Sequence, residues 1–319
     1  MSASSLPAWV AAHVPDQSGR VAVVTGANAG IGFETARGLA LRGAHVVMAC
    51  RSLDRAHAAQ GRIRAEHPSA STEVVHLDLA DLDSVAACAE AVAARHERVD
   101  LLLNTAGVMA LPERRETTQG FEMQWGVNVL GHYALTARLM PQVLAASGSR
   151  VVTVASLAHK RGTLNAEDLN SERSYDPWAA YGQSKLGDLV LAIELQRRLG
   201  AAGADGTMSV AAHPGWTQTE LAEDATAGSR LMSLAFNAIW PLVAMETWRG
   251  ALPTLVAATS SHTHPGDYIG PNGFGEQRGD PARASMTDEA RDPATGQTLW
   301  AACERMTGLE IPLGAPEAI

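Results

Sequence analysis

The stretch Val21-Ala-Val-Val-Thr-Gly-Ala-Asn-Ala-Gly-Ile-Gly32 joins an apolar run to a cluster of three glycines. Val21–Thr25 has the length and composition of a strand that is buried on both faces. The glycines permit a tight turn and let backbone N–H groups approach a pyrophosphate, and a following helix supplies partial positive charge. The spacing is Gly-x3-Gly-x-Gly, so a purely structural turn is the alternative interpretation. Its place after the first buried strand favours nucleotide binding by Gly26, Asn28, Gly30, Ile31 and Gly32.

Similar apolar runs recur along the chain and alternate with stretches of helical period. Such alternation implies right-handed βαβ crossovers and one parallel sheet covered on both faces. We therefore predict a single doubly wound (Rossmann-type) α/β domain over residues 1–319, with about seven strands. The further strands are expected at His45–Ala49, Glu73–Leu77, Val99–Asn104, Arg150–Ala155, Met208–Ala212 and Tyr268–Ile269. The helices are expected at Glu34–Arg42, Leu53–Glu66, Leu82–Arg95, Gly120–Leu144, Ala179–Leu199 and Thr219–Val243.

Three segments fall outside this alternation. Residues 1–19 are interpreted as an N-terminal extension, 220–249 as a lid over the substrate, and 275–319 as a C-terminal extension. Gly270–Pro281 is rich in Gly and Pro and is expected to be a loop. A last helix is expected to begin at Asp292-Pro293, where a capping residue precedes a proline in the first turn.

Composition limits the class of protein. The 319 residues are 46% hydrophobic and 18% charged, with net charge −9, which indicates a soluble globular chain and argues against nucleic-acid binding. Cys50, Cys88 and Cys303 lack the spacing of a zinc site and are expected to be buried in a reducing compartment. The apolar stretch Leu231–Met245 is too short to span a bilayer, and no signal peptide is evident. We expect a cytoplasmic protein without a transmembrane segment.

The end of the second strand bears on the choice of cofactor. An acidic residue there would hold ribose hydroxyls, whereas a basic residue accommodates a 2′-phosphate. The chain reads Met48-Ala-Cys-Arg-Ser52, with Arg51 at the tip and no carboxylate. A surface charge without a role is the alternative. We predict NADP(H) rather than NAD(H).

Tyr181 and Lys185 stand four residues apart on an expected helix, so both project from the same face. A phenol has a pKa of about 10 and is a poor acid or base at neutral pH, and a neighbouring cation lowers that pKa. Of the 25 basic residues only Lys160 and Lys185 are lysines, which suggests that a lysine is needed at 185. By spacing alone a solvated helix face would be favoured; together with the glycine loop, the pair indicates proton transfer.

This combination resembles the short-chain dehydrogenase/reductase family. Further matches occur in order: Asp78-Leu79, Asn104-Thr-Ala-Gly107, Asn128, Ala155-Ser156 and Pro214-Gly-Trp-Thr-Gln-Thr219. Thr105 departs from the family's Asn-Asn-Ala-Gly, and a second serine before Ser156 is missing. The glycine loop, Ala49-Cys-Arg51 and the 25-residue gap from Ser156 to Tyr181 are most similar to retinol dehydrogenases and their soluble bacterial relatives.

The resemblance implies roles for these residues. NADPH would deliver hydride to a carbonyl carbon, Tyr181 would exchange the proton, Ser156 would orient the carbonyl oxygen, and Lys185 would bind the nicotinamide ribose. Asn128 would hold a water next to Lys185. The implied cofactor contacts are the glycine loop, Arg51, Asp78, Leu79, Asn104, Ala106, Gly107, Tyr181, Lys185, Pro214, Gly215, Thr217 and Thr219. The family also implies a homo-dimer or homo-tetramer through the helices that carry Asn128 and Tyr181.

The substrate is less well defined. Leu231–Met245 has apolar residues at helical spacing, which suit either core packing or a lid over a bulky apolar ketone, aldehyde or alcohol. Reduction of a carbon–carbon double bond and a non-enzymatic NADP-binding regulator remain alternatives. His262-Thr-His264 offers too few ligands for a metal, so no metal site is predicted. His159 and His213 are expected to be structural.

Overall fold

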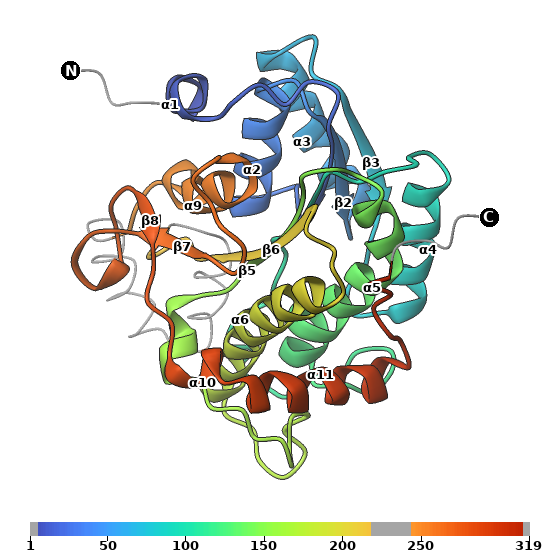
Figure 1. Cartoon of the computed structure of the whole chain (residues 1–319), viewed down its shortest axis with the longest axis vertical. Coiled ribbons are helices and arrows are strands. Elements are labelled where there is room, and N and C mark those ends of the chain that lie inside the picture. Colours follow the sequence, from blue (N-terminus) through green and yellow to red (C-terminus); the bar gives the residue numbers. More distant parts are fainter. Residues whose placement is uncertain (1–5, 218–243, 315–319) are drawn as a thin grey trace.

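The computed structural model describes residues 6–217 and 244–314 and is built around one eight-stranded sheet (Figure 1). The strand order is β3-β2-β1-β4-β5-β6-β7-β8. All neighbours pair in parallel except β7 and β8. The chain therefore moves outward from β1 in both directions, and the reversal between β1 and β4 creates the crevice where such sheets bind ligands. The strands are β1 (Val21–Thr25), β2 (His45–Cys50), β3 (Thr72–His76), β4 (Leu101–Asn104), β5 (Ser149–Val154), β6 (Thr207–Ala212), β7 (Tyr268–Pro271) and β8 (Pro281–Arg283).

Helices cover both faces of the sheet (Figure 1). One face carries α1 (Leu6–His13), α2 (Gly30–Leu41), α3 (Leu53–Glu66) and α9 (Thr247–Thr259), and the other carries α4 (Leu82–Ala93), α5 (Gly131–Leu144) and α6 (Pro177–Ala201). Within β1, Val23 packs into one core while Ala22 and Val24 pack into the other. This two-sided burial is why the strand reads as an uninterrupted apolar run. The predicted fold class is confirmed.

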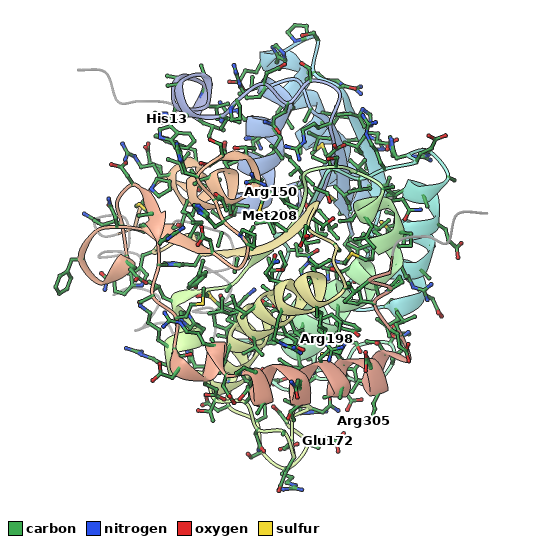
Figure 2. All side chains as sticks on the ribbon, in the orientation of Figure 1. His13, Arg150, Glu172, Arg198, Met208 and Arg305 are labelled. Atoms are coloured by element: carbon green, nitrogen blue, oxygen red, sulfur yellow. The ribbon has the colours of Figure 1, made fainter. Side chains whose placement is uncertain are left out.

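The C-terminal helix α11 (Pro293–Thr307) begins where the sequence predicts, with Asp292 accepting hydrogen bonds from the N–H groups of residues 294 and 295. It follows the short helix α10 (Asp288–Arg291) and packs along α6. Arg198 of α6 stacks its guanidinium over the Trp300 ring at 4.4 Å (Figure 2). Trp300 also meets Tyr133 of α5 edge-on. The outer side of α6 is therefore covered by the chain itself.

Arg150 in β5 fixes the position of α9. Its side chain is buried and donates to the carbonyl oxygens of Ala257 at 2.8 Å and Ser260 at 2.9 Å (Figure 2). These carbonyls lie at the C-terminal end of α9. The last carbonyl groups of a helix have no N–H partner within the helix and carry partial negative charge, which attracts a cation. Burial lowers the pKa of Arg150 to about 10, so the guanidinium keeps its charge at neutral pH.

Several elements differ from the sequence predictions. β8 lies inside the predicted C-terminal extension, and it pairs antiparallel to β7 as a three-residue edge strand whose Gly- and Pro-rich surroundings hide it. α1 lies in the predicted N-terminal extension, and α9 begins within the predicted lid. The predicted helix 120–144 is a π-helical segment over Trp125–Leu130 followed by α5. The predicted helix 219–243 lies outside the described residues.

Other expectations concern burial. Cys50, Cys88 and Cys303 are buried and unbridged, as predicted. Burial raises the pKa of the Cys50 thiol to about 11. Within residues 6–217 and 244–314, no helix combines the length and apolar character needed to cross a bilayer.

Candidate active site

The glycine loop connects β1 to α2 through conformations that favour glycine. Gly26 and Gly30 have φ values of +66° and +57°. A Cβ on Gly32 would lie 2.5 Å from the carbonyl oxygen of Gly26, so the loop closes on itself without room for a side chain. The N-cap residue Ala29 makes no side-chain cap hydrogen bond to α2. The first turn of α2 thus keeps the N–H groups and partial positive charge that suit a phosphate.

The end of β4 is tied to the glycine loop through two threonines. The Thr25 hydroxyl oxygen accepts from the backbone N–H groups of Thr105 at 2.9 Å and Ala106 at 3.0 Å. The Thr105 hydroxyl donates in return to the carbonyl of Thr25. Thr105, which departs from the family pattern, therefore joins the two strands that flank the crevice. Ala106 also lies against Gly26, where an added Cβ would come within 3.1 Å.

Arg51 follows β2 directly and is exposed at the same edge of the sheet as the glycine loop. Ser52 caps α3 by accepting from the N–H of Arg55 at 3.4 Å. The Cys50 thiol receives hydrogen bonds from the backbone of Ala27 and Asn28, which holds the end of β2 against the loop. The tip of β2 carries no carboxylate, as the sequence indicates.

Asp78 and Leu79 follow β3 and make a turn instead of pointing freely into solvent. The Asp78 carboxylate accepts from the N–H of Ala80 at 3.0 Å, and its N–H donates to Ser84 at 2.9 Å. Leu79 is buried against Gly131, the first residue of α5, where an added Cβ would lie 2.6 Å from the Leu79 carbonyl oxygen. The predicted adenine contacts therefore lie on a rigid turn.

Tyr181 and Lys185 are both buried near the start of α6. The helix is nucleated by Asp176, whose carboxylate accepts from the N–H groups of Trp178 and Ala179. The Lys185 ammonium donates to the Val154 carbonyl at 3.0 Å and to Asp188 at 2.8 Å. Burial works to lower the pKa of Lys185, but the charges of Asp188 and Tyr181 outweigh it and leave the pKa above its usual value. The ammonium is therefore kept charged.

Asn128 lies in the π-helical segment, and its side chain is fully engaged. It accepts from the Val108 N–H at 2.9 Å and donates to the Val108 carbonyl at 3.0 Å and to Ser184 at 2.9 Å. Ser184 donates in turn to the carbonyl oxygen of Tyr181. A Cβ on Gly107 would lie 3.1 Å from the Asn128 oxygen and 3.6 Å from the Lys185 nitrogen. The predicted residues Gly107, Asn128, Tyr181 and Lys185 therefore gather in one place.

Ser156 lies just beyond β5, and two buried aromatic residues hold its backbone. Its hydroxyl accepts from the Ala158 N–H at 3.2 Å and caps the short 3-10 turn Leu157–Arg161. The Ser156 carbonyl accepts from the imidazole of His159 at 2.7 Å and from the hydroxyl of Tyr268 at 3.5 Å. These contacts fix the position from which Ser156 would orient a substrate oxygen.

Asn104 points away from the crevice into the interior. Its amide nitrogen donates to Thr136 at 3.2 Å, and its oxygen is buried without a hydrogen-bond partner. It lines a cavity of about 30 Å³ together with His132, Thr136, Thr153 and Asp188. A predicted contact of Asn104 with the cofactor would therefore have to come from its backbone. The cavity is large enough for one water, which would satisfy the orphaned oxygen.

The loop after β6 bends beside the glycine loop. Gly215 has φ +66°, and a Cβ there would lie 2.4 Å from the Gln277 carbonyl oxygen. The Thr217 hydroxyl donates to Pro214 at 2.9 Å. Thr217 and Ile31 both come within 3 Å of a Cβ built on Gly250. Pro214, Gly215, Thr217 and Ile31 thus lie together, whereas the predicted contact Thr219 lies outside the described residues.

His159 and His213 shape the loops beside the site. The His213 ring accepts from the Gly215 N–H at 3.2 Å, and burial lowers the pKa of His213 to about 3. Its other nitrogen lies 3.6 Å from Glu276. Burial also lowers the pKa of His159. Both rings are therefore neutral and position backbone, which supports the structural interpretation.

Sequence reasoning missed a second ion pair next to these histidines. Lys160 donates to Glu276 at 2.8 Å and to Ser285 at 2.9 Å. This contact joins the turn after Ser156 to the segment between β7 and β8. The rarity of lysine was the available signal, and it applied to Lys160 as much as to Lys185.

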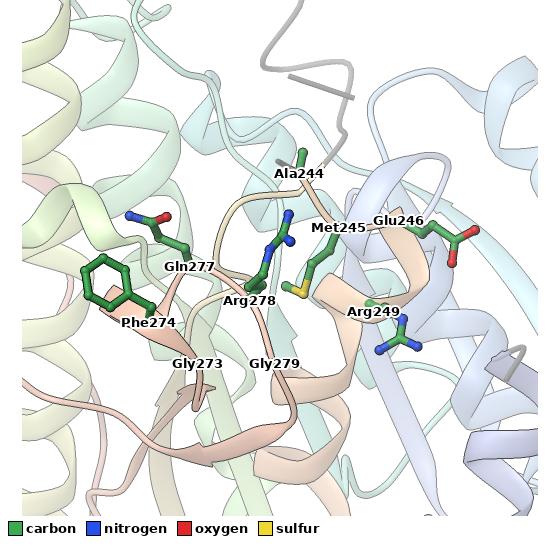
Figure 3. Close-up of a pocket in the computed structure, with 9 residues that line it drawn as sticks. All are labelled: Ala244, Met245, Glu246, Arg249, Gly273, Phe274, Gln277, Arg278 and Gly279. Carbon is green, nitrogen blue, oxygen red and sulfur yellow. The ribbon is translucent and has the colours of Figure 1, made fainter. Parts of the chain in front are cut away.

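A cavity of about 750 Å³ opens beside the loop that carries Gly215 (Figure 3). Its wall combines Met245, Glu246 and Arg249 at the start of α9 with Phe274, Gln277 and Arg278 between β7 and β8. Trp216 bonds to both walls, donating to the Gln277 carbonyl and accepting from the Met245 N–H. None of the four predicted catalytic residues lines this cavity. Glu246, Arg249 and Arg278 place charge on its rim, and residues 220–243 of the predicted lid lie outside the described residues.

Known proteins match most of this chain. The family model for short chain dehydrogenase matches residues 20–230. Human retinol dehydrogenase 13 is 39% identical over 296 residues, covering 92% of this chain and 86% of that protein. Mouse polyprenol dehydrogenase is 42% identical over 299 residues, with the same coverage of 92% and 86%.

A solved structure also covers nearly the whole chain. An uncharacterized protein from Mycobacterium paratuberculosis is 39% identical, with a TM-score of 0.78 over 95% of this chain and 99% of that one. The similarity therefore extends beyond the cofactor half to the C-terminal elements around α9 and α11.

Proposed function

The chain belongs to the short-chain dehydrogenase family, and from this premise we propose an NADP(H)-dependent oxidoreductase that interconverts a carbonyl and an alcohol. The observation that carries the proposal is the buried group of Tyr181, Lys185 and Asn128 beside Gly107. The residues that carry the phenol and the ammonium lie beside Gly107 at the carboxyl ends of the strands, which is where sheets of this kind bind their ligands.

The residues present fit a dinucleotide. The turn is cramped, since a Cβ on Gly32 would collide with the Gly26 backbone and one on Gly26 would lie only 3.1 Å from Ala106, and it leaves a backbone-lined cradle for a pyrophosphate. When bound, the nicotinamide supplies or accepts hydride at the substrate carbon. Arg51, exposed at the tip of β2, is assigned to the 2′-phosphate of NADP(H), for which a guanidinium is well suited.

The protein's own groups would move the proton. Tyr181 gives a proton to the carbonyl oxygen during reduction and takes it back during oxidation, while Ser156 hydrogen-bonds the same oxygen. Lys185 has three N–H bonds: two donate to Val154 and Asp188, and we assign the third to a ribose hydroxyl. Its positive charge interacts electrostatically with Tyr181. Val108 and Ser184 hold the Asn128 side chain in place, and we assign to Asn128 the binding of a water that links Lys185 to solvent.

We propose a bulky apolar substrate. The names of the similar proteins, retinol dehydrogenase and polyprenol dehydrogenase, refer to isoprenoid alcohols. The 750 Å³ cavity is open to solvent and is lined by none of the four catalytic residues, so we assign to it only the part of the substrate remote from the reacting carbon, with Met245 as a flexible apolar wall. Its charged residues Glu246 and Arg249 would face the polar end of the molecule or the solvent.

The C-terminal helix bears on assembly. The sequence predicts an oligomer through the helices that carry Asn128 and Tyr181, but α11 packs on α6 and buries Trp300 against Tyr133. Any subunit contact through α6 would have to include α11. Light scattering of the purified protein measures the subunit number directly.

The experiment is NADPH oxidation against a panel of apolar and polar carbonyls, comparing wild type with Tyr181→Phe. We expect preference for apolar carbonyls, loss of turnover by at least about a thousandfold in Y181F, and NADPH affinity within about threefold of wild type. NADPH fluorescence measures binding separately from turnover. Y181F activity within tenfold of wild type would refute the role of Tyr181. Reduction of enones at the carbon–carbon bond would favour the alternative reaction.

A further inference from the structure

Three side chains from separate elements meet at the amino edge of the sheet, at the opposite end of β2 from the glycine loop. His45 is the first residue of β2, Glu73 is the second residue of β3, and His96 follows the end of α4 by three residues. A Glu73 carboxylate oxygen lies 2.6 Å from Nε2 of His96 and 3.6 Å from Nε2 of His45. Each of the three residues offers one ligand atom, and these three atoms all lie within 4.8 Å of one another.

The sheet register explains this meeting. Val47 pairs with Glu73 across the parallel strands β2 and β3, and His45 shares a face with Val47 because strand side chains alternate. Val47 packs into the core under α4, so His45 and Glu73 both leave the sheet on the side that α4 covers. The chain leaving α4 then returns His96 to the same point. The three residues are therefore held by backbone pairing and helix packing.

The cluster is oriented as a ligand set. Nδ1 of His45 is hydrogen-bonded to the Ser71 hydroxyl at 2.7 Å, while its Nε2 is buried without a hydrogen-bond partner and faces Glu73. A buried polar atom without a hydrogen-bond partner costs free energy unless something binds it. Arg95 engages the other Glu73 oxygen at 3.1 Å. Such second contacts, a hydroxyl behind a histidine and a cation behind a carboxylate, orient metal ligands in proteins.

The chemistry of two imidazole nitrogens and one carboxylate oxygen matches zinc and its neighbours in the first transition series. Tetrahedral ligands at about 2.1 Å from zinc lie about 3.4 Å apart, and His45 and Glu73 are already at 3.6 Å. His96 would move back from the carboxylate by less than about 1 Å. We propose that His45, Glu73 and His96 bind one divalent transition-metal ion of the zinc class, with water completing the coordination.

The proposed ion would stabilise the structure and take no part in the reaction. β2 is six residues long, which separates His45 from the cofactor edge by about 17 Å. The ion would connect the starts of β2 and β3 to the end of α4, three elements of the cofactor half. The proposal does not depend on the proposed enzymatic function.

Isothermal titration of the untagged, EDTA-treated full-length protein with Zn²⁺ tests the site. We expect one ion per chain, and a rise in Tm of about 4 °C at a hundredfold excess over Kd. Mg²⁺ should give no rise, because it prefers oxygen ligands. With Co²⁺, the visible absorption of a tetrahedral complex should appear in wild type, which reports coordination without any variant.

Variants locate the ion. His96→Ala and His45→Ala should each weaken Zn²⁺ binding by at least about tenfold, and Ser71→Ala should weaken it less while leaving all three ligands. The matched control is His262→Ala/His264→Ala, which removes two exposed histidines from a loop elsewhere and should change nothing. The proposal is overturned by absence of saturable binding, in which case the cluster is an ion pair between Glu73, His96 and Arg95. Binding that survives H45A and H96A but is lost in the control would also overturn it.

Discussion

The two lysines of the chain make the same bond in opposite surroundings. Lys185 lies 2.8 Å from Asp188 and Lys160 lies 2.8 Å from Glu276. The side chains of the first pair are 7% and 3% exposed, and those of the second are 36% and 19% exposed. Desolvation makes the buried charges costly to hold and far more costly to separate, whereas water screens the outer pair. Equal distances therefore do not imply equal importance.

The pairs also differ in what they connect. Lys185 and Asp188 lie within one turn of α6, and the bond to Val154 attaches that turn to β5. Lys160 and Glu276 lie 116 residues apart and hold the turn after Ser156 against the segment between β7 and β8. In the proposed mechanism the inner pair sets the charge at the reacting groups, whereas the outer pair holds a loop in position.

The largest expected effect comes from breaking the inner pair. Lys185→Met should abolish turnover and lower the free energy of unfolding by about 3–5 kcal/mol, because it leaves the Asp188 carboxylate buried and unpaired. Urea denaturation and NADPH oxidation measure the two effects. The double variant K185M/D188L should regain most of the stability and none of the activity. Full stability in K185M alone would show that the inner pair is no more costly to break than a surface pair.

Acid should destabilise both regions through buried histidines. Burial lowers the pKa of His132, beside the Lys185 region, to about 4, and that of His213, beside Glu276, to about 3. Below about pH 6.5 these two histidines bind protons in the unfolded chain but not in the folded chain, so the free energy of unfolding falls as the pH falls. Between pH 7 and pH 5 we expect a loss of about 2 kcal/mol for each histidine. The raised pKa of Asp188, about 6, acts in the opposite direction over this range, so urea denaturation at several pH values is compared between wild type and His213→Gln, and equal slopes would contradict a neutral buried ring at 213.

A subtler change keeps the inner hydrogen bond and removes one charge. Asp188→Asn leaves an amide oxygen for Lys185 but no carboxylate to balance the ammonium, so the net positive charge beside Tyr181 increases. We expect the acidic limb of the pH–rate profile for alcohol oxidation to move to lower pH. Three other side chains interact electrostatically with Asp188 or Lys185 and are unchanged in the variant: Tyr268 of β7, His132 of α5 and Cys303 of α11.

Glu194→Gln is the matched control for D188N. Glu194 is a buried carboxylate on the same helix and is paired with Arg197 and Arg198 instead of the lysine. E194Q should lower stability without moving the pH–rate profile. Equal movement in both variants would assign the effect to helix stability and not to the field at Tyr181.

The smallest effect is expected at the outer pair. Lys160→Met should change the free energy of unfolding by less than about 1 kcal/mol and turnover by less than about threefold. Both values come from the same denaturation and turnover measurements as for K185M. A loss of activity comparable to that of K185M would mean that the loop position held by Lys160 controls catalysis.

Local sequence patterns were sufficient to predict the parallel sheet. The double-sided burial of residues such as Val23 and Val24 leaves a continuous apolar run, and the glycines before α2 mark the turn after it. β8 escaped prediction because three residues at a sheet edge carry no period. The π-helical segment around Asn128 depends on contacts from Val108 and Ser184, which no local signal encodes.

The candidate site likewise contains some residues that the local sequence predicts and others that it does not. Tyr181 and Lys185 are recognisable because their spacing places them on one helix face. Asp188, Thr105 and Glu276 matter through partners that only the fold brings near. The sequence predicted no metal site, since His45, Glu73 and His96 are separated by more than twenty residues each and meet only through the register of β2 with β3.

The rarity of lysine has a practical consequence for chemical labelling. An amine-acylating reagent meets only the α-amino group and two side chains, and Lys185 is buried with two hydrogen bonds in place. Lys160 is therefore the side chain that such a reagent would modify first. A dye attached through it would sit beside the turn after Ser156, and would report on that turn by fluorescence once the label on the α-amino group is separated from it.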